Sequence, residues 1–216
     1  MSKTCVIFDW DGTLIDSTAK IIHCMQQAAN DVGLPPVADQ AIRTLIGLSL
    51  EETTFRLYPD ADRSLRIKLQ QAYSHFFVLT DQTSCCFFDG VESTLHALLN
   101  KGIDVAVATG KSRKGLDRVL VNLGWSRFFS ATRCADETAS KPNPLMLHEL
   151  LDELMCVPEQ AIMVGDTTFD MHMAQAAGMD GVAVSYGAHS AKELLACLPL
   201  ALIDRLDDLL PLVLAQ

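Results

Sequence analysis

The feature that most constrains the fold is a short apolar stretch near the N-terminus that ends in two carboxylates. Residues 5–8 are all β-forming apolar residues, which is typical of a strand buried on both faces of a sheet. Asp9 and Asp11 follow at the carboxyl end of this predicted strand, and Gly12 allows the chain to turn there. Because ligands bind at the carboxyl ends of strands in open α/β sheets, the stretch predicts a polar site at that edge.

The two carboxylates place a constraint on each other. Two close carboxylates repel, and a hard cation such as Mg²⁺, or a proton on one of them, relieves the repulsion. An isolated Asp-x-Asp-Gly is more often a solvated turn, because Asp and Gly are ordinary turn residues. The apolar segments on both sides and the further polar clusters downstream favour a functional site over a simple turn.

Composition narrows the class of protein. The chain has 216 residues, a hydrophobic content of 49% and a formal net charge of −10, so it can bury a good core but would not attract nucleic acid or an anionic membrane. The seven cysteines lie mostly in apolar segments without a CxxC pair, which is typical of a reducing compartment. With no secretory signal pattern and no apolar run of membrane-spanning length, we expect a cytoplasmic protein.

The rest of the chain divides into two regions by its periodicity. Residues 16–84 carry only helical signals, beginning with Ser17 as a predicted N-cap. From residue 85 onward strands and helices alternate, which predicts a doubly wound (Rossmann-like) parallel sheet with right-handed crossovers. We therefore expect an α/β core of residues 1–15 and 85–216 with an all-helical cap, 16–84, inserted after the first strand. The later strands are predicted at 103–108, 128–132, 161–164, 181–184 and 200–203.

Polar residues stand at the exits of the later strands and loops as well. Thr109 and Lys111 follow the second strand, Lys141 precedes a helix, and Asp166 and Asp170 follow the strand predicted at 161–164. Carboxylates bind Mg²⁺, whereas a hydroxyl, an ammonium and backbone N–H groups bind phosphoryl oxygens. A carboxylate near a phosphorus atom is also a nucleophile that can form an aspartyl-phosphate. Each residue alone has an ordinary structural explanation, but their joint occurrence at strand exits predicts a phosphoryl-transfer site.

These clusters and their neighbours form four ordered motifs that span the chain. They are residues 8–14 (FDWDGTL), 107–111 (VATGK), 141–144 (KPNP) and 164–171 (VGDTTFDM). In this order they resemble the motifs of the haloacid dehalogenase-like (HAD) hydrolase superfamily. The helical region after the first motif is similar to the cap of the phosphoglycolate phosphatase-like subgroup.

The resemblance implies roles for the acids. Asp9 would be the nucleophile and a Mg²⁺ ligand. Asp11 would be the general acid and base, with its main-chain carbonyl on the metal. Asp166 would bind Mg²⁺ directly, and Asp170 would either bind beside it or hold a metal-bound water or a lysine.

The resemblance also implies which groups bind the phosphoryl group. Thr109 and Lys141 would contact it together with backbone N–H groups near Gly12 and Gly110, and Lys111 is a weaker candidate for the same role. Trp10 stands where such proteins commonly carry Leu or Met, and we expect its side chain to point away from the metal and change only the packing.

The helical region would close over the site and exclude water during phosphoryl transfer. Arg43 resembles a cap residue that faces substrate and could pair with a substrate carboxylate or a second phosphate. A surface arginine on a helix is the commoner alternative for this residue.

The resemblance predicts a Mg²⁺-dependent phosphatase that hydrolyses a small phosphorylated metabolite, acting as a monomer or homodimer. Phosphoglycolate is the first candidate substrate, and pyrophosphate, sugar phosphates and nucleoside monophosphates compete with it. A sugar phosphomutase is the nearest enzymatic alternative. A dehalogenase is disfavoured, because Asp11 supplies the acid that an oxygen leaving group needs. A receiver-type signalling domain also uses strand-end aspartates, but it needs neither this second acid nor a long helical insertion.

Overall fold

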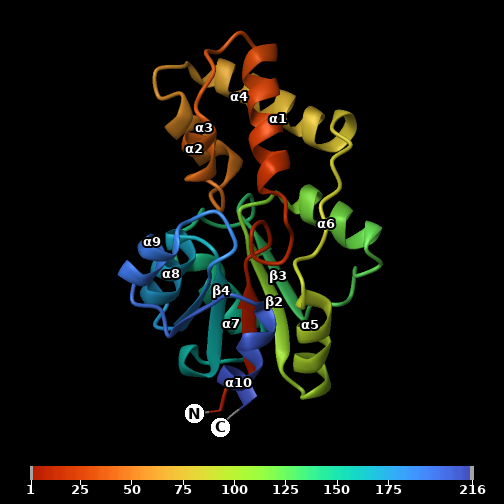
Figure 1. Cartoon of the computed structure of the whole chain (residues 1–216), viewed down its shortest axis with the longest axis vertical. Coiled ribbons are helices and arrows are strands. Elements are labelled where there is room, and N and C mark those ends of the chain that lie inside the picture. The colour runs from red at the N-terminus through yellow and green to blue at the C-terminus, as the bar shows by residue number, and fades with distance from the viewer. Residues whose placement is uncertain (1, 215–216) are drawn as a thin grey trace.

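The computed structural model describes residues 2–214, and its centre is a parallel sheet of six strands (Figure 1). The strands are β1 (Cys5–Phe8), β2 (Asp104–Thr109), β3 (Ala131–Cys134), β4 (Ala161–Gly165), β5 (Asp180–Val184) and β6 (Ala201–Ile203). Their order is β3-β2-β1-β4-β5-β6, with every neighbouring pair parallel. The predicted doubly wound sheet is confirmed. The strand order reverses at β1, which is the position where open α/β sheets bind ligands.

Helices fill two different positions. Between β1 and β2 lie α1 (Thr18–Asp31), α2 (Asp39–Arg43), α3 (Leu50–Leu57), α4 (Arg63–His75), the π-helical turn η1 (Phe76–Thr80) and α5 (Val91–Asn100). After β2 come α6 (Arg113–Asn122), α7 (Leu145–Glu153), η2 (Pro158–Gln160), α8 (Thr168–Ala176), α9 (Ala191–Ala196), η3 (Leu206–Asp208) and α10 (Leu209–Leu214). Residues 18–80, which we call the helical insertion, stand beyond the carboxyl ends of the strands in Figure 1.

Both faces of the sheet are covered, which explains why residues 5–8 are uniformly apolar. Val6 and Phe8 pack into a core that also includes side chains of α5, α6 and α10. Cys5 and Ile7 point to the other face, where they pack with side chains of α7 and α8. Successive side chains of a strand alternate between faces, so a strand covered on both sides needs apolar residues throughout. This covering leaves the carboxyl-end edge of the sheet for polar groups.

Trp10 lies in the first of these cores. Its side chain is fully buried and meets Phe129 edge to face, with ring centroids 6.0 Å apart. The indole therefore contributes packing beneath the site. The strand predicted at 128–132 was placed too early, because β3 begins at Ala131. Phe128 instead stacks on Trp125 in the preceding turn, with ring centroids 4.2 Å apart.

The helical insertion has an apolar core of its own. Ile22 and Met25 of α1, Ile42 of α2, Tyr58 and Leu69 are buried together there. The insertion therefore packs as a helical unit beyond the sheet edge, in agreement with the predicted architecture. The predicted boundaries at 15/16 and 84/85 stay a prediction.

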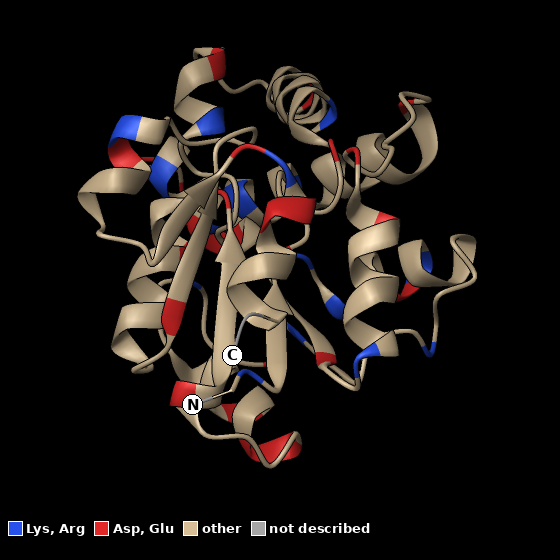
Figure 2. Cartoon of the chain, turned by 60° about the horizontal axis from the view of Figure 1, so that its bottom comes forward, with Lys and Arg blue, Asp and Glu red and all other residues tan. Residues whose placement is uncertain are grey.

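Charged residues of both signs are distributed along the described chain, with Lys and Arg interspersed with Asp and Glu (Figure 2). Among residues 2–214, none of the helices combines the length and the apolar character that crossing a membrane requires. The cytoplasmic location and the monomer or homodimer state stay predictions.

Candidate active site

The polar residues predicted at the strand exits meet at the carboxyl edge of the sheet. Asp9 directly follows β1, and its backbone N–H donates to the Val164 carbonyl at 2.9 Å. Thr109 is the last residue of β2, and Asp166 directly follows β4. Since β1 pairs with both β2 and β4, these three side chains leave adjacent strands at the same level.

A buried lysine joins two of the acids. The Nζ of Lys141 lies 2.5 Å from Oδ1 of Asp9 and 2.7 Å from Oδ1 of Asp170. Lys141 comes from the loop between β3 and α7, and Asp170 comes from the first turn of α8. All three side chains are buried, so water screens this network only weakly.

Burial strongly perturbs the titration of these groups. Burial raises the pKa of Asp9 well above its usual range, against the opposing effect of the Lys141 ammonium. Burial, together with the neighbouring Asp170, raises the pKa of Asp166 to about 7. Burial would lower the pKa of Lys141, but Asp170 and Asp9 outweigh it and raise that pKa. The cluster thus holds more negative charge than one ammonium balances.

The geometry fits a divalent cation. Asp9, Asp166 and Asp170 each offer a carboxylate oxygen, and these ligand atoms lie within 4.8 Å of one another. Oδ2 of Asp9 is buried and accepts no hydrogen bond from any residue in the described range 2–214. An unpartnered buried acceptor is costly, and a Mg²⁺ ion would satisfy it with the oxygen ligands that this ion prefers. Three carboxylates and one ammonium would also be brought to neutrality by a double positive charge.

Asp166 is held in one orientation by the surrounding chain. Thr13 Oγ1 donates to its Oδ1 at 2.9 Å, and the Ala188 N–H donates to its Oδ2 at 2.7 Å. Gly12 has a φ of +87°, and a Cβ built there would lie 2.2 Å from Asp166 Oδ2. The predicted turn at Gly12 therefore has a second function, which is to leave room for this carboxylate.

Asp170 serves two structural purposes at once. Its Oδ1 accepts from Lys141, while its Oδ2 accepts from the N–H and the hydroxyl of Thr167 at 3.1 and 2.6 Å. Thr167 and Asp170 thereby form the capping box of α8. The helix start thus fixes the acid that orients Lys141.

Asp11 lies apart from the three clustered acids. Lys111 Nζ contacts its Oδ2 at 2.8 Å, and Ser17 Oγ donates to its Oδ1 at 2.6 Å. Ser17 precedes α1 as predicted, but its side chain makes no capping bond, because it is used by Asp11. Lys111 and Ser17 thus hold the two carboxylate oxygens of Asp11 in place.

Thr109 and Gly110 form the exit of β2. The Thr109 hydroxyl is buried and accepts from the Lys111 N–H at 3.2 Å. A Cβ at Gly110 would lie 2.5 Å from the carbonyl oxygens of Gly47 and Leu48 in the helical insertion. The insertion and the core therefore touch at this glycine.

A cavity of about 400 Å³ opens beside Asp9 and Asp11 and extends under the helical insertion. Thr109, Gly110 and Lys111 line it as well. Arg43, at the end of α2, is half-buried and is not among the residues that line this cavity. The structure therefore does not bring Arg43 to the other candidate site residues.

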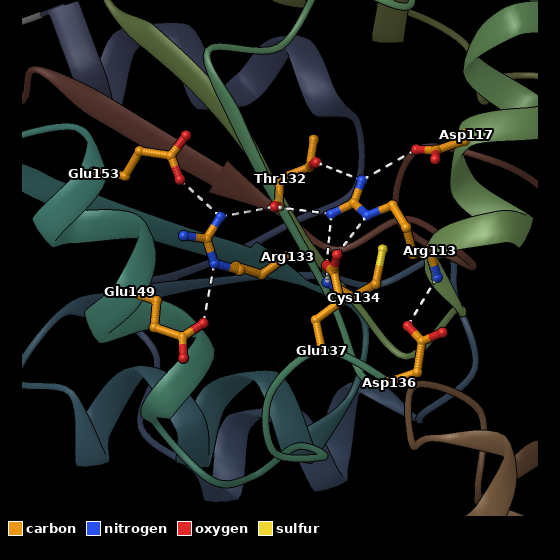
Figure 3. Close-up of polar contacts among 9 residues, drawn as sticks. All are labelled: Arg113, Asp117, Thr132, Arg133, Cys134, Asp136, Glu137, Glu149 and Glu153. Carbon is orange, nitrogen blue, oxygen red and sulfur yellow. Dashed lines mark hydrogen bonds and ion pairs between the residues drawn. The ribbon is translucent and has the colours of Figure 1, made fainter.

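An arginine network outside the cavity holds two of the site loops together (Figure 3). The guanidinium of Arg113 donates to Thr132 Oγ1 at 2.8 Å and pairs with both carboxylate oxygens of Glu137 at 2.9 and 2.7 Å. Its backbone N–H donates to Asp136 at 2.8 Å. Arg113 thus ties the start of α6, after the Thr109 exit, to the segment that leads to Lys141.

Sequence reasoning missed several residues that shape the site. Thr13, Thr167 and Ser17 each donate a hydroxyl hydrogen bond to one of the acids, and Tyr73 of α4 lines the cavity. The hydroxyls lie close to the motif acids in sequence, so a search for donors beside each acid would have found Ser17 and Thr167. No local signal marks Tyr73.

Comparison with known proteins agrees with this fold and site. Residues 6–184 match the family model described as haloacid dehalogenase-like hydrolase. The chain belongs to this family.

Named relatives lie within the same family. The chain is 32% identical to "Probable phosphatase IndB" of Dickeya dadantii over 210 residues. This aligned region covers 95% of this chain and 91% of the relative. It is 29% identical to the phosphoglycolate phosphatase of Vibrio vulnificus strain YJ016, over 98% of this chain and 96% of the relative. The solved structure of a haloacid dehalogenase-like family hydrolase from Streptococcus pneumoniae superposes with a TM-score of 0.83 at 24% identity, covering 97% of this chain and 98% of the other.

Proposed function

We propose that this protein is a Mg²⁺-dependent phosphatase that hydrolyses a small-molecule phosphomonoester through an aspartyl-phosphate on Asp9. The observation that carries the proposal is the buried carboxylate oxygen of Asp9, unpartnered, beside Asp166, Asp170 and the cavity that Asp9 itself lines. When bound, Mg²⁺ would be held by Asp9, Asp166 and the Asp11 main-chain carbonyl, with Asp170 as a further ligand, and it would offset the charge of the transferring phosphoryl group.

In the first step a carboxylate oxygen of Asp9 attacks the phosphorus, and the bond from phosphorus to the ester oxygen breaks. The Asp11 carboxyl group gives a proton to that leaving oxygen. Lys141 keeps Asp9 in one orientation and offers its ammonium to the phosphoryl oxygens, together with the Thr109 hydroxyl and backbone N–H groups at Gly12 and Gly110.

In the second step water attacks the phosphorus of the aspartyl-phosphate. Asp11 accepts a proton from this water, the Asp9–phosphorus bond breaks, and inorganic phosphate leaves. Lys111, 2.8 Å from Asp11, acts with Ser17 to hold that carboxyl group in one position for both steps. The contact of the helical insertion at Gly110 supports the idea that bulk water is excluded while the phosphoryl group moves.

The test is release of inorganic phosphate from a panel of phosphomonoesters in the presence of Mg²⁺. The panel includes phosphoglycolate, because two relatives are named phosphoglycolate phosphatase. We expect Asp9→Asn and EDTA each to abolish release while circular dichroism stays native. Asp16→Asn is the matched control, because Asp16 is an exposed aspartate near the same motif, and it should retain full activity. Sustained turnover by purified Asp9→Asn protein would rule out the nucleophile.

The same panel separates the alternatives. A sugar phosphomutase would convert a sugar phosphate into its isomer with little phosphate release. A signalling domain would retain phosphate on Asp9 after incubation with a small phosphodonor, whereas a phosphatase turns it over rapidly. Mass spectrometry of the intact protein during turnover distinguishes these outcomes.

A further inference from the structure

The cavity beside Asp9 and Asp11 has two walls of different chemistry. One wall belongs to the helical insertion and consists mainly of apolar side chains. Its apolar members are Ile21, Met25, Ile42, Leu45, Ile46, Leu48, Leu50, Tyr73, Phe77, Val78 and Leu79. Its polar members are uncharged or histidine: Thr53, Ser74 and His75. The insertion therefore contributes no Lys, Arg, Asp or Glu to the described lining.

The other wall belongs to the core and carries all the cations of the lining. Lys111 is already engaged, because its Nζ lies 2.8 Å from Asp11 and 4.9 Å from the centre of the Phe77 ring. Lys114 and Arg118 lie one turn apart on α6, and Lys114 is exposed. These cations lie on the same wall as the acids. An anionic group placed against the insertion wall therefore has no cationic partner there.

The size and polarity of the cavity fit a leaving group unlike glycolate. At about 30 Å³ per water molecule, a cavity of about 400 Å³ has room for about a dozen waters. Glycolate offers a single methylene group and an ionised carboxylate, so it would leave most of this apolar wall uncovered. An ionised carboxylate against an apolar wall also loses hydration without gaining a partner.

Resting on the phosphatase function proposed above, we propose that the physiological substrate is a phosphomonoester whose leaving group is an uncharged, mainly apolar alcohol larger than glycolate. The phosphoryl group lies at Asp9, and the alcohol extends along the wall formed by α1, α2, α4 and η1. Tyr73 and Phe77 provide aromatic faces in that wall, and Val78 and Leu79 border it from η1. Substrate choice is then set by burial of apolar surface.

A series of straight-chain alkyl phosphates tests the proposal. From butyl to heptyl phosphate the leaving alcohols have nearly equal acidity, so differences in kcat/KM report binding to the wall. We expect kcat/KM to rise about fourfold for each added methylene until the cavity is full. We also expect kcat/KM to be higher for butyl phosphate and longer esters than for phosphoglycolate.

Two matched variants locate the effect. Val78 lines the cavity and is 42% exposed, whereas Val121 on α6 is 65% exposed and does not line it. Val78→Lys should flatten the dependence of kcat/KM on chain length and raise kcat/KM for phosphoglycolate relative to hexyl phosphate. Val121→Lys should change neither. Both positions are exposed, so neither substitution removes a buried core side chain.

The outcomes are separable from those that test the phosphatase proposal itself. If no ester releases phosphate, or if Asp9→Asn retains activity, the proposed function fails. If esters are hydrolysed but phosphoglycolate is preferred and kcat/KM does not rise with chain length, the apolar leaving group is refuted while the phosphatase stands. Loss of a phosphoglycolate preference in Lys114→Ala or Arg118→Ala would show that the cationic wall selects the substrate instead.

Discussion

The core and the helical insertion lie close together at Gly110, so Gly110→Ala is a direct test of whether a closed insertion is needed for catalysis. The methyl group of alanine would lie 2.5 Å from the carbonyl oxygens of Gly47 and Leu48. Both obstructing atoms belong to backbone, so no side-chain rotation relieves the contact. Gly110 has no positive φ, which means that alanine meets only this steric obstacle.

The size of the effect follows from the distance. Real Cβ contacts rarely fall below 3.0 Å, and 3.4 Å is comfortable, so the insertion must move away by 3.0 − 2.5 = 0.5 Å to 3.4 − 2.5 = 0.9 Å. A displacement of about 1 Å in a catalytic assembly costs about 100-fold in rate. We therefore expect Gly110→Ala to lower kcat/KM by about tenfold, equivalent to about 1.4 kcal/mol.

The assay pairs turnover with a local probe of closure. The Ser49 N–H of the insertion donates to Ser140 Oγ of the core at 2.9 Å, so exchange of this amide reports opening. Gly110→Ala should accelerate that exchange and lower kcat/KM together. Gly115→Ala is the matched control for the exchange measurement, because its Cβ would meet only Ser112 Oγ at 3.2 Å, and it should leave Ser49 exchange unchanged.

Two results would refute this reasoning. Wild-type kcat/KM in Gly110→Ala would show that displacement of the insertion is harmless. A tenfold loss with unchanged Ser49 exchange would show that the alanine disturbs the phosphoryl-binding backbone directly and leaves the insertion closed.

Four further predictions concern the buried charges and the arginine network. Lys141→Met leaves Asp9 and Asp170 without their ammonium, and urea denaturation should show a loss of about 3 kcal/mol in the free energy of unfolding; a loss within experimental error would contradict it. In EDTA the folded-state pKa of Asp166 is about 7, whereas its usual value is 3.8. At a pH between these two values, Asp166 therefore binds a proton when the protein folds. Stability should therefore fall as pH rises from 4 to 7, and Asp166→Asn should flatten that slope in thermal unfolding. Because Mg²⁺ competes with this proton, the rise in Tm caused by Mg²⁺ should be larger at pH 8 than at pH 5, and the reverse order would exclude Asp166 as a ligand. Arg113→Ala should lower the free energy of unfolding by about 2 kcal/mol, and Arg113→Lys should not restore it, because lysine lacks the paired donors that meet Glu137.

The sheet and the acids at its edge could be predicted because local sequence determines both. A strand covered on both faces must be apolar at every position, as residues 5–8 are, and the polar residues that follow it mark where the strand leaves the core. The same pattern at β2 and β4 predicts that Thr109 and Asp166 lie next to Asp9, and the pairing of β1 with both strands agrees with it.

The contacts that complete the site are not local, and sequence reasoning did not find them. Tyr73 reaches the cavity only because α4 packs against α1, more than 40 residues away in the chain. Arg43 was proposed from its position in a cap segment, but the orientation of α2 decides which side chains face the cavity, and Ile42 faces it instead. A helix five residues long has too little periodicity to predict which face it buries.

The position of the insertion explains why the motifs predict the chemistry better than they predict the substrate. The four motifs lie at sheet edges and loops of the core, where Asp9, Lys141 and Asp166 lie close together and would surround the phosphoryl group in the proposed reaction. The wall that would meet the leaving group in our proposal comes from residues 18–80, whose side chains need only keep the insertion folded and able to contact Gly110. Relatives near 30% identity can therefore share the reaction while their insertion walls differ. The side chains that line this chain's own cavity are thus stronger evidence about the substrate than the name of a relative.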